Sequence, residues 1–216
     1  MLDNVYLALD TVKASRDVNF VKPTADLRRT LLDASIDLVA TEGLEALSMR
    51  EVARRAGVSH QAPYHYFTDR EAILAEIVAE GFRQLRAEMV SVAAAAKTPA
   101  KRLSAIGRAY VAFALANPAH FTLLFRSELV PADKHKAAHA CANAAFDLLV
   151  STVDEVVRQN LGKPDPSLVL AAWSLAHGLA TLMLEGKLKE QIGDSRRSQV
   201  AAVHDALDAF TRLIER

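Results

Sequence analysis

The side chains best suited to binding chemistry lie in one stretch near the N-terminus, residues 47–74. Gln61 carries an amide that can form two hydrogen bonds with adenine, and Arg50 carries a guanidinium that can contact a guanine edge or a phosphate. The hydroxyls of Ser48 and Ser59, together with helix N-terminal amides, are donors for phosphate oxygens. These residue types are suited to contacts with the backbone and the base edges of duplex DNA.

Four further residues extend this candidate surface. His60 stands beside the glutamine and can contact a base edge or a phosphate, and Tyr64 and His65 suit phosphates or a thymine methyl group. Arg70 offers a positive charge to the DNA backbone. Each of these side chains is also of a type that is often simply solvated on an exposed helix, so both interpretations stay open at this stage.

The spacing around these residues predicts a helix-turn-helix. Ala53 supplies a small residue where two helices cross closely, and Gly57, four residues later, can take the positive φ that the turn requires. Val58 is expected to fill the small core between the helices, and Ser59 is expected to cap a very short second helix that runs through Tyr66. This second helix is the one that would enter the major groove.

The flanking sequence predicts the helices that hold this unit. Thr24 is a candidate cap for a helix that ends at Gly43, and Ser48 followed by Glu51 forms a capping box. Thr68 and the glutamate three residues later form a second capping box, which opens a long helix running to about Ala95. Residues 1–22 are expected to form an arm or a short extra helix.

Beyond residue 98 the chain stays helical, with prolines at the joints between helices. No alternating pattern typical of β-strands occurs. We therefore expect an all-α protein of about nine or ten helices, with an N-terminal three-helix unit (23–68) joined by a long helix to a helical body (69–216). The expected later helices span residues 99–116, 118–127, 133–161, 166–185 and 195–214.

The N-terminal segment resembles the DNA-binding domain of the TetR family of transcriptional regulators. The resemblance covers about residues 24–85 and rests on GVS at 57–59, YHYF at 64–67 and DREAIL at 69–74. It implies a regulator that binds a palindromic double-stranded DNA operator as a homodimer, with no enzymatic activity and no cofactor. Repression that a small effector releases is the usual behaviour of this family.

The body carries aromatic residues of the kind that line apolar pockets between helices. Trp173, His177 and Gly178 resemble the tryptophan–histidine–glycine motif of one branch of TetR-like regulators. Core packing is the alternative for each residue, and a structural hydrogen bond is the alternative for His177. The residues predicted to line a pocket for a small apolar or amphipathic effector are Tyr110, Phe113, Phe121, Phe125, Phe146, Trp173 and His177.

The resemblance also implies how the body would act. In the family the last two long helices pair with a second copy, and Gly178 is expected to allow close helix approach. A ligand that prefers one tilt of the long helix beginning near Thr68 would change the spacing of the two recognition helices.

Three other classes of protein compete with this interpretation. His135, His139 and Cys141 have a spacing that can hold zinc, but flanking lysines disfavour a cation and no metal site is predicted. No phosphate loop, nucleophile elbow or acid pair typical of an enzyme is present. With 26 basic and 26 acidic residues the chain is neutral overall, so a dimeric ligand carrier that no longer binds DNA stays a rival.

The same features favour a cytoplasmic protein. A single cysteine excludes an internal disulfide framework, and the first residues lack the basic-then-apolar order of a signal peptide. The uncharged stretch 166–184 is nearly long enough to span a bilayer, but its serines, threonine and histidine favour a helix buried by protein.

Overall fold

The computed structural model describes residues 25–160, 163 and 165–215. In this part of the chain the regular elements are helical throughout, which confirms the all-α prediction. The expectations for residues 1–22 and for Thr24 lie outside the described residues. The elements are α1 (Ala25–Glu42), η1 (Leu44–Ala46), α2 (Met49–Arg55), η2 (Ala62–His65), α3 (Arg70–Ala95), α4 (Pro99–Ala116), α5 (Pro118–Leu124), η3 (Ser127–Leu129), α6 (Lys136–Asn160), α7 (Pro166–Leu184), α8 (Leu188–Ile192) and α9 (Arg196–Ile214).

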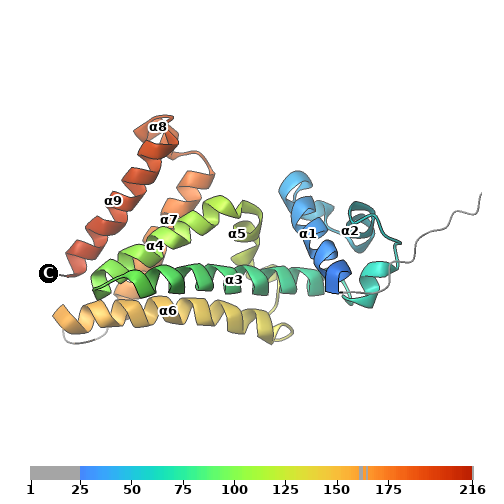
Figure 1. Cartoon of the computed structure of the whole chain (residues 1–216), viewed down its shortest axis with the longest axis horizontal. Coiled ribbons are helices and arrows are strands. Elements are labelled where there is room, and N and C mark those ends of the chain that lie inside the picture. Colours follow the sequence, from blue (N-terminus) through green and yellow to red (C-terminus); the bar gives the residue numbers. More distant parts are fainter. Residues whose placement is uncertain (1–24, 161–162, 164, 216) are drawn as a thin grey trace, which may run out of the picture.

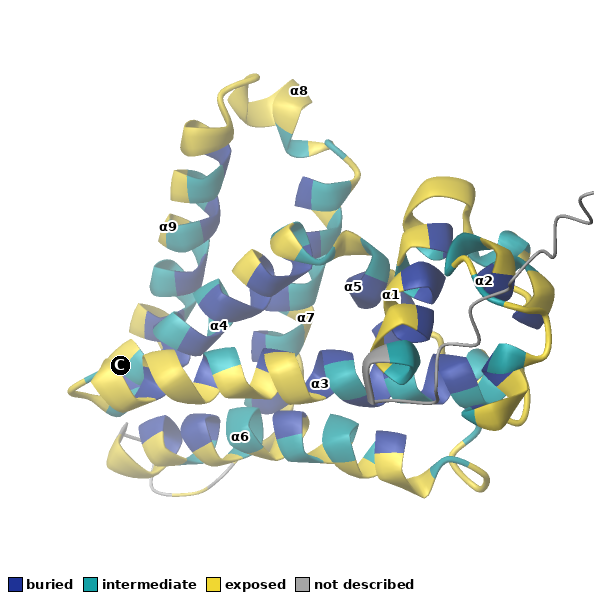
Figure 2. Ribbon diagram, turned by 45° about the vertical axis from the view of Figure 1, so that its right-hand side comes forward, coloured by how far each residue is buried: buried dark blue, intermediate teal, exposed yellow. Residues whose placement is uncertain are grey.

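The 26-residue helix α3 runs along most of the molecule and joins its two halves (Figure 1). At one end lie α1, α2 and η2, and at the other end α4 and α6 flank α3 while α7 and α9 pack beyond them. Figure 2 shows buried residues recurring along α1, α3 and α6, whereas α8 is mostly exposed. One helix therefore contacts both the N-terminal unit and the body.

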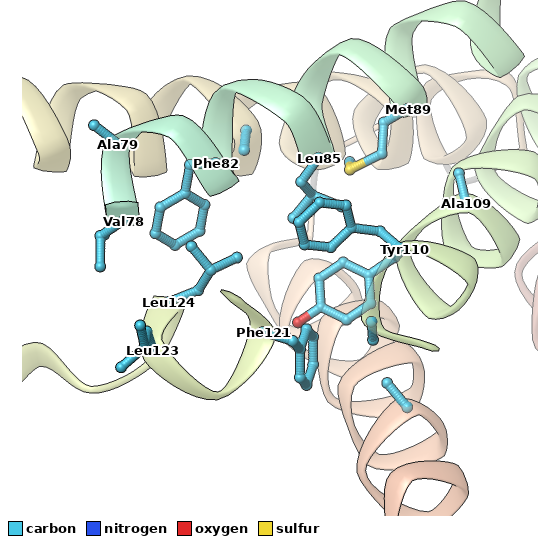
Figure 3. Close-up of a cluster of buried hydrophobic side chains, with 14 of the residues drawn as sticks. Val78, Ala79, Phe82, Leu85, Met89, Ala109, Tyr110, Phe121, Leu123 and Leu124 are labelled. Atoms are coloured by element: carbon cyan, nitrogen blue, oxygen red, sulfur yellow. The ribbon is translucent and has the colours of Figure 1, made fainter. Parts of the chain in front are cut away.

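The body core forms where α3, α4 and α5 turn large apolar side chains toward one another. Phe82 of α3 points toward Leu124 of α5, and Tyr110 of α4 points toward Phe121 (Figure 3). α5 sits so close to α3 that a Cβ on Gly81 would lie 2.8 Å from Leu124 Cδ2. An alanine there would force the end of the Leu124 side chain to shift, so the glycine allows the present close packing of α5 on α3.

The helix caps are as predicted at α2 and one residue off at α3. Ser48 Oγ accepts a hydrogen bond from the Glu51 amide at 3.2 Å, which confirms the first capping residue. At α3 the cap is Asp69, whose carboxylate accepts from the Ala72 amide at 2.8 Å, so the prediction of Thr68 was wrong. A carboxylate has the advantage of adding favourable charge at the positive end of the helix.

The expected α-helix from Ser59 to Tyr66 is replaced by a turn and the 3-10 helix η2. The Ala62 amide bonds to the Ser59 carbonyl at 3.0 Å, a three-residue spacing, and the Ser59 side chain caps nothing. Pro63 explains the difference, since it has no N–H with which to continue an α-helical ladder back to Ser59. This segment, residues 59–66, which we call the recognition segment, is therefore wound more tightly than an α-helix.

Helix α7 is the one helix of the described residues that is long and apolar enough to cross a membrane, with 19 residues and a mean hydropathy of 1.6. It packs against α4, α6 and α9. Its inner face is buried at Val169, Ala172, Ala176 and Ala180. Only 28% of its apolar window is buried, so α7 has one inner face and one outer face and is not the fully covered helix that its polar residues led us to expect.

Candidate nucleic-acid interface and ligand cavity

The turn between α2 and η2 has the geometry that its sequence predicted. Gly57 has a φ of 68°, and the Val58 amide bonds back to the Ala53 carbonyl at 3.0 Å. Ala53 is 1% exposed, and Val58 packs against the core. The left-handed backbone at Gly57 therefore sets the angle at which the following segment leaves α2.

The segment after this turn presents polar side chains to solvent. His60, Gln61, Tyr64 and His65 are all exposed, and Tyr64 has 53% of its surface accessible. Gln61 Nε2 lies 3.0 Å from His60 Nε2, so these neighbours form a hydrogen-bonded pair. Phe67 is 4% exposed and belongs to the core. The arrangement offers a compact polar surface of the kind that reads base edges.

The arginines of α2 differ in what they already bind. Arg54 pairs with Glu51 on the same helix, and Arg55 bridges Asp37 and Glu42 of α1. The Arg55 guanidinium thus connects α2 to α1. Arg50 is exposed, and no ion pair among the described residues includes it. Of these guanidiniums, Arg50 is the one best placed to bind an external anion.

Arg70 is used inside the protein. Its Nη2 donates a hydrogen bond of 2.8 Å to the Leu44 carbonyl, and its Nε is buried. The side chain therefore braces the loop between α1 and α2 against the start of α3. Nearby, the Arg28 guanidinium stacks 5.3 Å from the centre of the Phe67 ring. The first contact joins α3 to the loop before α2, and the second joins α1 to Phe67, the residue that directly follows Tyr66.

The body contains an apolar cavity of about 260 Å³ between α3, α4, α6, α7 and α9, and this cavity reaches the surface at Phe146, which is 41% exposed. Four of the predicted pocket residues line it: Tyr110, Phe125, Phe146 and Trp173. The other lining residues are Phe82, Leu85, Met89, Leu103, Ile106, Gly107, Ala142, Asn143, Ala145, Leu149, Ala172, Ala176, Leu207, Phe210 and Thr211.

Three predicted residues lie beside this cavity and do not line it. Phe113 is fully buried in the core. Phe121 and His177 stack on each other with ring centres 5.4 Å apart, and the Tyr110 hydroxyl lies 2.8 Å from His177 Nδ1. Burial lowers the pKa of His177 below its usual value, which favours a neutral ring in this hydrogen bond. This geometry matches the structural alternative for His177.

Most of the cavity wall was not predicted. Phe82 and Leu85 appeared in the sequence only as the apolar stripe of a long helix, and Phe210 carried no separate signal. A stripe shows that one helix face is covered, but it does not show whether side chains or empty space cover it. Only the packing of five helices identifies these residues as lining.

The two histidines of the possible zinc site have separate partners. His135 Nε2 lies 2.7 Å from Glu71 Oε1, and His139 Nε2 lies 2.9 Å from the Val130 carbonyl. No group of three or more potential metal ligands occurs in the described part of the chain. The His135–Glu71 contact joins the start of α6 to the first turn of α3.

A second helix links the cavity to the N-terminal unit. Phe125, which ends α5, lines the cavity, while α5 itself packs against both α3 and α1. His120 of α5 is buried, and burial lowers its pKa. A movement of α5 would therefore change its contacts with α1.

Comparisons with known proteins match both halves of the chain. The family described as bacterial regulatory proteins, tetR family, matches residues 31–77, and the Tetracyclin repressor-like C-terminal domain matches residues 103–209. The HTH-type transcriptional regulator BetI of Rhizobium meliloti is 37% identical over 81 residues, which are 38% of this chain and 40% of that protein. The match thus spans less than half the length of this relative.

Solved structures cover much more of the chain. A protein from Rhodococcus sp. RHA1, described as of unknown function, has a TM-score of 0.75 and 30% identity, with 93% of this chain and all of that chain covered (100%). The regulator FadR from Bacillus subtilis, solved with stearoyl-CoA, has a TM-score of 0.66 at 15% identity over 85% of this chain and 97% of that chain. The latter likeness shows the fold alone. With the helix-turn-helix and the helical body both matched, the chain belongs to the TetR family of transcriptional regulators, whose members are not enzymes.

Proposed function

We propose that this protein is a cytoplasmic transcriptional repressor that binds a palindromic DNA operator as a homodimer and is released by a small effector. The observation that carries the proposal is the position of α3. Its first residue, Arg70, donates a hydrogen bond to the Leu44 carbonyl in the loop that leads into α2, and its middle supplies Phe82, Leu85 and Met89 to the cavity wall. A ligand that changes the tilt of α3 would move the segment that reads DNA.

The DNA-binding part of the proposal rests on the exposed side of η2 and the start of α2. Ser48, Arg50 and Ser59 would position the unit on phosphates, and His60, Gln61, Tyr64 and His65 would face the base edges. Arg70 supports this surface from behind, through its bond to Leu44. The chain has no net charge, so binding would depend on this local arrangement and not on a global field.

The homodimer is supported by the outer faces of α7 and α9. Leu170 and Leu182 of α7 are 58% and 40% exposed, and a Cβ added to Gly178 between them would meet no atom within 4 Å. Within the single chain this corrects our expectation that Gly178 permits close helix approach. On α9, Leu213 is 68% exposed. Apolar residues on two helices that pack together form a surface suited to self-association.

The effector part rests on the cavity, which is apolar and lies between helices of the body. We propose a small apolar or amphipathic effector, and we assign the chain to the branch with the Trp173, His177 and Gly178 motif. The stearoyl-CoA bound to the Bacillus subtilis regulator is a precedent for an amphipathic ligand in this fold.

Selection of bound fragments from random duplex DNA with the purified full chain tests the proposal. We expect a palindrome, and we expect its affinity to fall with rising salt as phosphate contacts require. Absence of salt-dependent binding to any selected DNA would favour the ligand carrier instead. Sizing of Leu170→Glu protein beside the wild type tests the dimer, because a buried charge at the interface should give a monomer.

A further inference from the structure

Two aromatic rings separate the main cavity from a second cavity. The second cavity, of about 190 Å³, lies between α3, α5, η3 and α6, and Phe82, Phe125 and Ala142 line both spaces. The Phe82 and Phe125 rings meet edge to face, with centres 5.9 Å apart and an interplanar angle of 84°. Such a contact is favourable for aromatic pairs and holds the two rings in place. We call this pair the partition.

The main cavity contains no Lys, Arg, Asp, Glu or His among its lining residues. Its few polar groups are largely occupied, because the Tyr110 hydroxyl bonds to His177 and the Thr211 hydroxyl donates to the Leu207 carbonyl at 3.0 Å. Asn143, which is exposed, is the polar side chain best placed to bind a ligand. A charged group inside this space would lose its hydration without gaining a partner.

The second cavity differs in one respect. It is apolar along Val78, Leu123 and Val130, but it also reaches Arg126, Ser127 and His139. The Arg126 side chain is 50% exposed, and His139 is already hydrogen-bonded to the Val130 carbonyl. The two cavities would form one longer apolar space with a polar end if the partition were removed.

We propose that the effector is a compact, uncharged, mainly hydrocarbon or aromatic molecule, and that the Phe82–Phe125 partition sets its maximum length. The inference deepens the proposed function by naming the ligand class of its cavity. Phe125 is suited to this role because it ends α5 and is only partly buried. Its ring contacts Phe121, Tyr110 and Trp173 as well, at centre distances between 5.3 and 6.4 Å.

Trp173 provides the measurement, since it lines the main cavity and is the only tryptophan in the chain. Straight-chain primary alcohols from hexanol to tetradecanol are titrated into the full-length protein without DNA while Trp173 fluorescence is recorded. Affinity should rise about fourfold with each added methylene until the chain fills the cavity, and then level off. Carboxylic acids of the same lengths should bind at least tenfold more weakly at neutral pH.

Phe125→Ala and Phe82→Ala should move the levelling-off point to longer alcohols by joining the cavities. Phe125→Leu and Phe82→Leu are the milder pair if truncation to alanine prevents folding, and thermal unfolding checks each variant. Phe113→Leu is the matched control, because Phe113 is a fully buried phenylalanine that lines neither cavity. It should keep the wild-type length limit.

An unchanged length limit in folded partition variants would overturn the inference, as would tighter binding of the carboxylates or no fluorescence response to any alcohol. Operator affinity with and without the bound alcohol is measured separately. If the alcohols show a length limit but do not change operator affinity, the inference stands and the proposed release of DNA by an effector is contradicted. If a long charged effector releases the protein from its operator, the proposed function stands and the inference about the ligand class is contradicted.

Discussion

The N-terminal unit and the body place their candidate sites in opposite ways. In the N-terminal unit the candidate residues are exposed side chains on a tight turn, and ion pairs between Arg55 and α1 hold the supporting helices together. In the body the site is an apolar space between five helices that is partly open to the surface, and no charged side chain lines it. One site is a surface made by a short segment, and the other is a volume made by the whole domain.

This difference teaches where each site can be damaged. The surface depends on one backbone conformation and a few polar groups, so single substitutions should abolish DNA binding without disturbing the body. The cavity depends on the shape of many apolar residues, so a substitution that fills it should abolish the response to ligand and leave DNA binding intact. The four predictions below test this separation, beginning with the largest expected effect.

Gly57→Val should give the largest loss. A β-branched residue at a φ of 68° is strained by about 1–3 kcal/mol, and relief of that strain would turn the recognition segment away from α2. We expect operator affinity to fall about 100-fold or more in a DNA-binding titration. Gly57→Asn tolerates positive φ and should retain most of the affinity. Equal losses in both variants would contradict a role for backbone conformation.

Ala176→Leu should abolish the response to ligand. Ala176 is 7% exposed and lines the cavity, so a larger side chain would occupy the ligand's space. The coupling between effector and DNA, typically about 5–150-fold, should disappear while operator affinity without effector stays unchanged. Ala206→Leu on α9, which is partly exposed and outside the cavity, is the control for DNA release. Normal release by the Ala176 variant would exclude this cavity as the effector site.

Arg50→Ala should weaken operator binding about tenfold, because the exposed guanidinium would lose a contact with a phosphate or a guanine. Arg54→Ala is the matched control on the same helix, since the Arg54 guanidinium is already paired with Glu51. Binding at several salt concentrations separates the two contacts. Loss of a phosphate contact reduces the salt dependence by about one ion, whereas loss of a base contact relaxes the sequence preference. Equal effects of both substitutions would remove the distinction between these arginines.

Mild acid should destabilise the body by a smaller amount. Burial lowers the pKa values of His120 and His177 below the usual value of 6.5, so the unfolded chain binds protons more readily than the folded chain. Stability should be complete above about pH 6.5 and decline as the pH falls further. Urea unfolding at a series of pH values measures this slope. His120→Leu should reduce this slope, and His60→Ala should leave it unchanged. An unchanged slope in the His120→Leu variant would show that His120 does not contribute to the acid sensitivity.

The sequence predicted the turn and the cap of α2 in the N-terminal unit, because these signals are local. Gly57, Ala53 and the Ser48 cap each act within a few residues, so type and spacing predict their conformation directly. The same local reasoning failed at Pro63, which converts the expected α-helix into a 3-10 helix, and at Asp69, which replaces Thr68 as the cap. In both places two plausible local rules competed.

The body was predicted only in outline. Prolines at helix starts and apolar stripes gave α4, α7 and α9 to within one residue, as at Pro99–Ala116. The predicted end of α5 and the predicted start of α6 were three residues off, and the short helix α8 was not predicted. Tyr110, Phe125, Phe146 and Trp173 were identified as cavity residues by type, while Phe113 and Phe121 were assigned to the lining with equal reason and lie outside it. Aromatic character by itself does not distinguish a wall residue from a core residue.

By itself, then, the sequence determined the helices, the turn and the family, because backbone conformation and helix periodicity depend on neighbours within one or two turns. Tertiary structure alone decided which arginines are free, which aromatic rings border empty space, and that Phe82 and Phe125 separate two cavities. The arginine pairs of α2 span between 3 and 18 positions, whereas Phe82 and Phe125 are more than 40 positions apart. No local pattern encodes such contacts, since they arise only when whole helices pack.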